Sequence, residues 1–103
     1  MPSHIRKRDG RLETWSTERI GQAILKALAP SGIKDPLLST RLAKKVATKL
    51  EDVDVPDQES VQDLVELVLM ESRLYTVAKR YILYREKRRE LRNQKAAFLN
   101  IKD

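Results

Sequence analysis

The chain has 103 residues, of which 41% are hydrophobic and 35% are charged, a mixture that fits one domain with a packed core and argues against disorder. It contains no cysteine and a single histidine, His4, which excludes disulfides, iron–sulfur clusters, thiolate or histidine-rich metal sites and cysteine nucleophiles within these residues. The formal net charge of +6 favours polyanionic partners, namely nucleic acid, an anionic membrane or nucleotide phosphates.

Residues 3–15 predict a β-hairpin around the turn signal Asp9-Gly10. Two turns fit this sequence. A two-residue type I′ loop would place Ile5 opposite Thr14, whereas a three-residue loop, with Gly10 left-handed in a bulge, would place Ile5 opposite Glu13. The choice matters because a slip of one residue moves every side chain of one strand to the opposite face of the hairpin. Periodicity alone leaves both turns open.

Two amphipathic helices are predicted next. The first should begin at Ser16 or Thr17, both good N-caps, and its apolar residues recur at helical spacing until Pro30. The second should open with Pro36 at the first helical position, where the missing N–H costs nothing. Leucine and valine residues recur one turn apart along it.

A short acidic link leads to the third helix. Residues 51–56 alternate valine with acidic residues and could add a third strand beside the hairpin. Asp57 or Ser60 should cap the helix that follows, since Ser60 with Asp63 has the spacing of a capping box. Its apolar stripe repeats that of the first helix.

The fourth helix is predicted to follow a turn near Ser72-Arg73, and its apolar stripe reaches only as far as Tyr84. From Arg85 to Asn100 there is too little apolar surface for packing along the whole length, so we expect the distal half to protrude. Its many basic residues make a nucleic-acid-binding or transcription-regulator domain the main alternative function. No apolar run approaches the roughly 20 residues of a membrane span and no signal-peptide pattern opens the chain, so we expect a cytoplasmic protein.

Motifs for catalysis are missing. The sequence contains no G-x-x-x-x-G-K-[ST] loop, and its three glycines form no G-x-G-x-x-G. A serine–histidine–carboxylate arrangement would depend on His4 alone. We therefore expect no catalysis by this chain.

A binding site could instead form from the hairpin and the helix ends. Lys7 and Arg8 on a strand could hold phosphate oxygens, and the N-terminus of the first helix offers N–H groups and a positive dipole end. The carboxylate of Glu13 could accept the amino group of a base. Taken singly, the same residues also fit a charged surface hairpin with Trp15 packed in the core.

Two separated sequence motifs resemble the ATP-cone family. The first motif is Ile5-x-Lys7-Arg8-Asp9-Gly10-x-x-Glu13-x-Trp15-Ser16-x-x-Arg19-Ile20. The second joins Val61-Gln62-Asp63-Leu64-Val65-Glu66 to Val77-Ala78-x-x-Tyr81-Ile82-x-Tyr84-Arg85-x-x-Arg88. The match spans residues 4 to about 92 and is similar to cones that precede anaerobic or cobalamin-dependent ribonucleotide reductases.

This resemblance implies a mainly α (α+β) fold, a four-helix bundle capped by a β-hairpin or small three-stranded sheet. It implies a cone over residues 1–92 and the start of a linker to a catalytic body over residues 93–103. The implied function is an allosteric module that is not itself an enzyme and binds ATP or dATP, with Mg²⁺ held through the phosphates. The implied partners are the catalytic domain of a parent reductase and a second copy of the chain, with neither membrane nor nucleic acid.

The resemblance also assigns residues to the nucleotide. Lys7 and Arg8 match the phosphate-contacting basic pair of the family, Glu13 matches its base-reading carboxylate, and Lys87 matches a phosphate-binding lysine of the last helix. The other assigned positions, around the base and sugar, are Ile5, Trp15, Ser16, Ile20, Val61 and Gln62. If one ligand is to meet both strands, the hairpin must adopt the bulged three-residue loop.

Two assigned positions depart from the family pattern. Arg19 stands where a lysine is common, and Gln58 stands where a small hydroxyl residue is usual. These departures leave a third interpretation, an interaction module whose ligand site has decayed. Ser16 and Arg19 are our candidates for residues that sense the sugar and so distinguish ATP from dATP.

Overall fold

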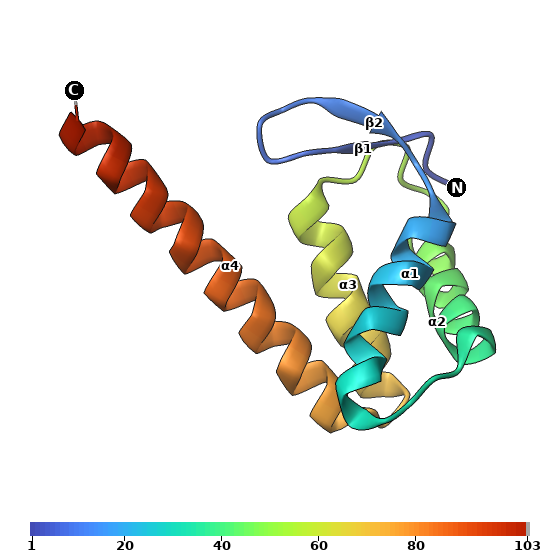
Figure 1. Ribbon diagram of the computed structural model, residues 1–103. Coiled ribbons are helices and arrows are strands. Elements are labelled where there is room, and N and C mark those ends of the chain that lie inside the picture. The colour runs from blue at the N-terminus through green and yellow to red at the C-terminus, as the bar shows by residue number, and fades with distance from the viewer. Residues whose placement is uncertain (103) are drawn as a thin grey trace.

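The computed structural model describes the backbone of residues 1–102 and the side chains of residues 1–99. It contains strands β1 (His4–Arg6) and β2 (Leu12–Thr14), a 3-10 turn η1 (Ala29–Ser31), and helices α1 (Thr17–Leu28), α2 (Pro36–Lys49), α3 (Gln58–Glu71) and α4 (Tyr75–Lys102). The hairpin lies across one end of the helices, and α4 extends away from them (Figure 1). This mainly helical fold with a hairpin cap confirms the predicted fold class.

The hairpin adopts the bulged turn. Ile5 lies opposite Glu13 in an antiparallel pair, the N–H of Lys7 donates to the carbonyl of Arg11 at 2.8 Å, and Gly10 has a φ of +88°. The left-handed φ is one that glycine adopts without steric cost. The three-residue loop is therefore confirmed, and the type I′ alternative, with Ile5 opposite Thr14, is wrong.

The acidic link runs beside β1 but forms no third strand in the described part of the chain. The N–H of Ser3 donates to Asp54 and the N–H of Arg6 to Pro56, both at 2.9 Å, and a single parallel bridge joins Arg6 to Asp57. Pro56 has no N–H with which to continue a ladder, and the next residue already caps α3. The sheet consequently has two strands, and the expected third strand is not formed.

Side-chain caps fix where three helices begin. Ser16 accepts from the N–H of Arg19 at 3.2 Å, which makes it, rather than Thr17, the N-cap of α1. Asp35 caps α2 in the same way. Asp57 accepts from the N–H of Ser60 at 2.8 Å, so Asp57 caps α3 and the capping box at Ser60 is not used.

The core lies among α1, α2, α3 and the first turns of α4, whose apolar stripes face one another. Its fully buried large side chains come from α1, α2 and α3 and are Ile24, Leu28, Leu42, Val46, Val68 and Leu69. Val77 and Ala78 bring the start of α4 into the same cluster. The apolar stripes in the sequence therefore predicted which faces of α1, α2 and α3 and of the start of α4 pack in the core.

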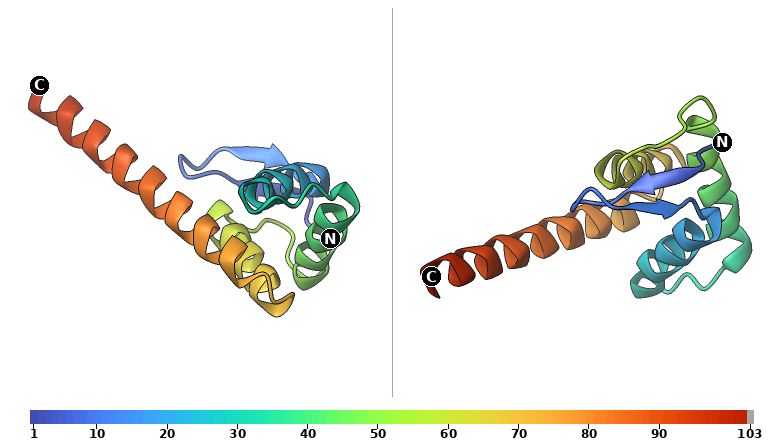
Figure 2. Two further views of the ribbon diagram at one scale, coloured as in Figure 1. Left: turned by 60° about the horizontal axis from the view of Figure 1, so that its bottom comes forward. Right: turned by 90° about the horizontal axis from the view of Figure 1, so that it is seen from above.

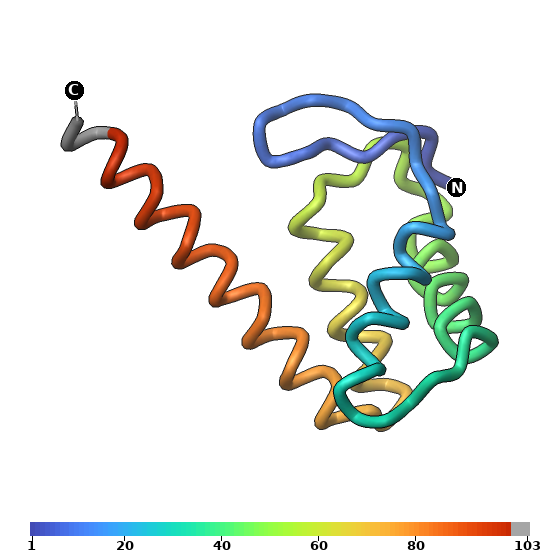
Figure 3. The backbone as a smooth tube through the Cα atoms, viewed as in Figure 1, coloured from blue at the N-terminus to red at the C-terminus, as the bar shows by residue number. Residues whose placement is uncertain are grey.

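Beyond this anchor, α4 leaves the bundle. A left-handed residue, Arg73 with a φ of +62°, turns the chain from α3 into α4. Leu91 and Phe98 are 52% and 57% exposed, and two further views show the outer half of the helix clear of the other elements (Figure 2), as does the backbone trace (Figure 3). The predicted protrusion is confirmed. No helix in the described range is both long and apolar enough to cross a membrane.

The cap at Asp57 yields a first prediction. The backbone N–H of Ser60 holds the pKa of Asp57 below its ordinary value, so the charged cap stabilises the fold above pH 3.8 and this contribution is lost as the pH falls through the lower, folded-state pKa. Asp57→Ala should lower the free energy of unfolding at pH 7 by about 1 kcal/mol, measured by urea denaturation. Asp57→Asn should retain most of that stability, since asparagine caps helices comparably well. Equal losses in the two variants would contradict the assignment of the cap.

Candidate functional site

A cavity of about 200 Å³ lies between the hairpin and the N-terminal halves of α1 and α3. Most of the residues assigned from the sequence line it, and they come from the hairpin, from α1 with its N-cap, and from α3. These lining residues are Ile5, Lys7, Glu13, Trp15, Ser16, Arg19, Ile20, Gln58, Val61 and Gln62. The structure thus brings together side chains that are far apart in the sequence, the most distant pair being Ile5 and Gln62, 57 positions apart.

The bulged turn aims the hairpin side chains into this cavity. Ile5 and Glu13 form a cross-strand pair and are half-buried, whereas their neighbours along each strand are exposed. Trp15 continues the inward face beyond β2 and is also half-buried, and its indole N–H donates to the hydroxyl of Thr17 at 2.9 Å. Trp15 both packs against the core and lines the cavity, so the two interpretations offered by the sequence hold together.

Glu13 gathers two cations at the cavity. Its Oε2 atom lies 3.3 Å from Nη1 of Arg19 and 3.8 Å from Nζ of Lys7. Two positive charges thus share one carboxylate, and the cluster keeps a net positive charge. A cavity with apolar walls and this charge suits an anionic ligand that carries an apolar ring.

Arg8 stands at the rim, outside the cavity lining. Its Nη2 atom donates to Oε1 of Gln62 at 3.2 Å and lies 2.7 Å from Oε1 of Glu59. Since Gln62 lines the cavity, Arg8 is one side chain away from it. Lys87, in contrast, is exposed on α4 and lines no cavity described for these residues, so the structure does not bring it to the site.

A second cavity, of about 180 Å³, opens between the hairpin, α3 and α4. Arg85 on α4 is the centre of its charge network and is only 16% exposed. It binds three carboxylates of α3, with Nη2 at 2.9 Å from Glu59, Nη1 at 3.0 Å from Asp63 and a further hydrogen bond to Glu66. These bonds, which outweigh partial burial, hold the pKa of Arg85 above its ordinary value. Arg85 therefore clamps α4 to α3.

Glu59 joins this clamp to the hairpin. One carboxylate oxygen contacts Arg8 and the other contacts Arg85. Partial burial would raise the pKa of Glu59, but the bonds from Arg85 and Arg8 keep it below its ordinary value. Sequence reasoning missed this network, although its signal was present: Glu59, Asp63 and Glu66 follow an i, i+4, i+7 spacing that places them on one face of α3.

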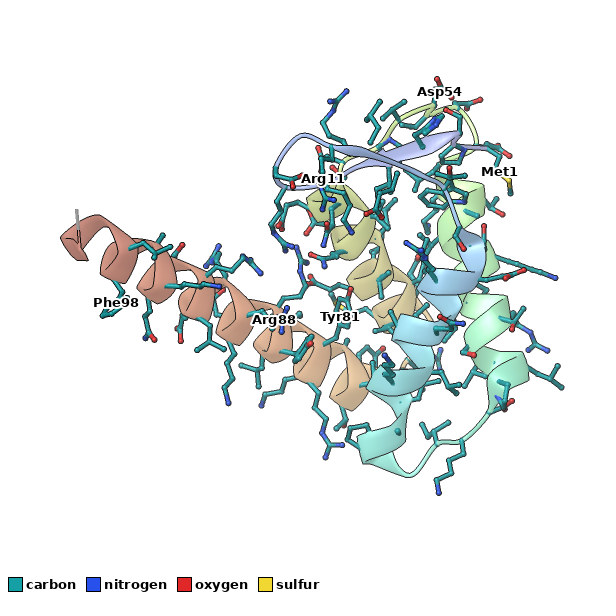
Figure 4. The ribbon with its side chains drawn as sticks, turned by 45° about the horizontal axis from the view of Figure 1, so that its top comes forward. Met1, Arg11, Asp54, Tyr81, Arg88 and Phe98 are labelled. Atoms are coloured by element: carbon teal, nitrogen blue, oxygen red, sulfur yellow. The ribbon has the colours of Figure 1, made fainter. Side chains whose placement is uncertain are left out.

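Tyr81 of α4 also lines the first cavity and was not assigned from the sequence. Figure 4 places Tyr81 between α4 and the body of the domain, while Phe98 lies near the far end of the helix. Burial raises the pKa of Tyr81 to about 12. The other unassigned lining residues are Thr14, Ala23 and Val65. Ala23 and Val65 lie one helical turn beyond Ile20 and Val61, so the apolar stripes contained a signal for them.

Comparison with known proteins identifies the family. The sequence profile of the ATP cone domain matches residues 3–90. The chain belongs to the ATP-cone family. Membership in this family supports a nucleotide-binding regulatory module.

Relatives of this cone include reductases. The chain is 40% identical over 110 residues to a vitamin B12-dependent ribonucleoside-diphosphate reductase of Thermoplasma acidophilum, and 39% identical over 102 residues to one of Mycobacterium tuberculosis. It is 32% identical over 100 residues to an anaerobic ribonucleoside-triphosphate reductase of Salmonella typhimurium. The matches cover 100%, 99% and 97% of this chain, but only 14% of each relative. The resemblance to cones of cobalamin-dependent and anaerobic reductases is confirmed.

The half-buried phenol of Tyr81 yields a second prediction. The absorbance of tyrosinate is measured against pH for the wild type and for Tyr81→Phe, and the difference between the two reports Tyr81. This difference should appear near pH 12, because burial disfavours the phenolate. Since the folded-state pKa is raised above 10.0, the protonated phenol stabilises the fold below pH 10, and this contribution is lost as the pH rises toward 12. A difference spectrum that titrates near pH 10 in the folded protein would show that Tyr81 is not buried.

Proposed function

We propose that the chain is an allosteric module that binds ATP or dATP in the cavity beneath the hairpin and regulates a ribonucleotide reductase. One observation carries the proposal: apolar walls, a carboxylate and a basic rim meet in one cavity of a chain from the ATP-cone family. The parent reductase, of which this chain would be a small part, is proposed from the relatives.

The lining fits an adenine ring. Ile5, Trp15, Ile20 and Val61 supply apolar contact on both sides of the cavity. The carboxylate of Glu13 can accept a hydrogen bond from the exocyclic amino group of adenine. Guanine carries a carbonyl oxygen at the corresponding ring position, which a carboxylate repels. The Glu13 carboxylate, as a hydrogen-bond acceptor, therefore favours adenine over guanine.

The phosphates do not fit inside the cavity. Its volume of about 200 Å³ is below the ~300–1,000 Å³ of pockets that enclose drug-sized ligands, so the triphosphate must extend over the rim. Lys7 and Arg8 lie on that side, and the N-terminus of α1 adds its dipole. The second cavity beside the rim is lined by Arg8, Arg85, Arg89 and Arg92 together with Glu59, Glu66 and Glu86, so most of its positive charge is already paired.

Mg²⁺ is proposed to arrive with the phosphates. Among the described residues, no group of three or more histidine, cysteine, aspartate or glutamate side chains could hold a metal ion on its own. Bound to the nucleotide, the ion would neutralise part of the phosphate charge. The residues of this chain would bind and orient the ligand without turning it over, because reductase radical chemistry requires cysteine thiols and these 103 residues contain none.

A binding experiment tests the ligand. Calorimetry should show ATP and dATP binding, GTP binding more weakly, and a DNA duplex failing to displace ATP. Glu13→Ala and Lys7→Ala should each weaken ATP binding by about tenfold or more, because each removes a hydrogen bond in which at least one partner is charged. Lys45→Ala, which removes one positive charge from an exposed position on α2, is the matched control and should bind as the wild type does. Tightest binding to DNA would favour the nucleic-acid alternative instead.

A second experiment tests regulation in the intact reductase that contains this cone. Glu13→Ala should abolish activation by ATP and inhibition by dATP while leaving the basal reductase rate unchanged. Lys87→Ala should weaken both responses if α4 turns Lys87 toward the phosphates in the intact enzyme. Regulation that stays normal in both variants would show that this site is not the switch.

A further inference from the structure

Two carboxylates at the proposed site each pair with two cations. Glu13 holds Lys7 and Arg19, and Glu59 holds Arg8 and Arg85. Glu13 lines the cavity and belongs to the proposed base contacts. Glu59 does not line it, so its position between two guanidinium groups requires a separate explanation.

Glu59 stands where a phosphate oxygen would be favoured. It lies between Arg8 of the hairpin and Arg85 of α4, with contacts of 2.7 Å and 2.9 Å from its two oxygens. Guanidinium groups bind phosphate and carboxylate oxygens with the same planar geometry. The same Nη2 atom of Arg8 also donates to Gln62, which lines the cavity. Arg8 can therefore reach either Glu59 or a ligand at the rim.

We propose that Glu59 is an internal competitor for Arg8, which the phosphates of the bound nucleotide displace. This inference rests on the proposed function. The ion pair is weak enough to exchange, because its side chains are 33% and 53% exposed and such pairs are screened by water and salt. A phosphate group offers Arg8 more charge and a paired set of acceptors.

The exchange leaves Glu59 with a partner. Arg85 continues to bind Glu59, Asp63 and Glu66, so α4 stays clamped to α3 after Arg8 departs. Only the partner of Arg8 changes, because Arg8 leaves the Glu59 carboxylate of α3 and binds the phosphates of the ligand. ATP and dATP carry the same phosphates, so Glu59 sets the affinity for both and does not distinguish them.

Calorimetry on the 103-residue chain tests this at low ionic strength. Glu59→Gln should bind ATP about two- to fivefold more tightly than the wild type, the range expected from removing one exposed ion pair, and should bind adenosine with unchanged affinity. The matched control is Asp63→Asn, which removes a neighbouring charge that contacts Arg85 and should leave ATP binding unchanged. In an Arg8→Gln background, Glu59→Gln should have no further effect.

Three results would each overturn the inference: unchanged or weaker ATP binding by Glu59→Gln, an equal gain from Asp63→Asn, or a gain that persists without Arg8. Glu59→Asp, which keeps the charge, should bind ATP as the wild type does and controls for loss of the side chain itself. If the wild type binds no adenine nucleotide, the proposed function fails. If it binds ATP and Glu59→Gln binds no more tightly, only the competition is wrong.

Discussion

The turn at the tip of the hairpin decides what the hairpin presents to the helices. The bond from Lys7 to Arg11 closes a three-residue loop, and Gly10 takes the left-handed φ that this loop requires. Ile5 is thereby paired with Glu13, and both side chains turn inward. A two-residue loop would have shifted the register by one position and moved Glu13 to the solvent face while Ile5 stayed inward. The apolar walls and the carboxylate would then never have met in one cavity.

The N-terminal half of α3 contacts both the hairpin and α4, so α3 physically links the cavity to the protruding helix. Gln62 lines the cavity and accepts from Arg8, while Glu59, one turn earlier, bonds to both Arg8 and Arg85. A guanidinium that is mostly buried is costly unless it is paired, and three carboxylates pair Arg85. Arg85 carries the ion pairs that join α4 to α3. The ribbon of α4 continues outward beyond the bundle (Figure 1).

Local signals predicted most of the fold, because caps and apolar stripes act over one or two turns. Ser16 and Asp57 are N-caps that the sequence offered, although for α3 it offered Ser60 as well. The third strand predicted from the alternation of valine with acidic residues does not form, because Pro56 has no N–H to continue a ladder of hydrogen bonds. The spacing of the three α3 carboxylates marks one face of that helix. However, the positions of Tyr81 and Arg85 opposite α3 depend on how α3 and α4 cross, which no local pattern encodes. Lys87 was assigned by its position in a motif, and the structure places it away from the cavity.

The proposed function requires the module to respond differently to ATP and dATP, which differ by a single ribose hydroxyl. One hydrogen bond contributes roughly 0.5–1.5 kcal/mol, and allosteric coupling is typically about 1–3 kcal/mol. The free energy of one hydroxyl contact can therefore account for the coupling only if the contact acts on an element that has two alternative arrangements. Ser16 already accepts from the N–H of Arg19 as the cap of α1, which leaves its hydroxyl hydrogen to contact a sugar. Ser16 also follows Trp15 directly at the junction of β2 and α1. A contact made or lost there would act on the cap and on the hairpin together, and through Arg8 on the network that holds α4.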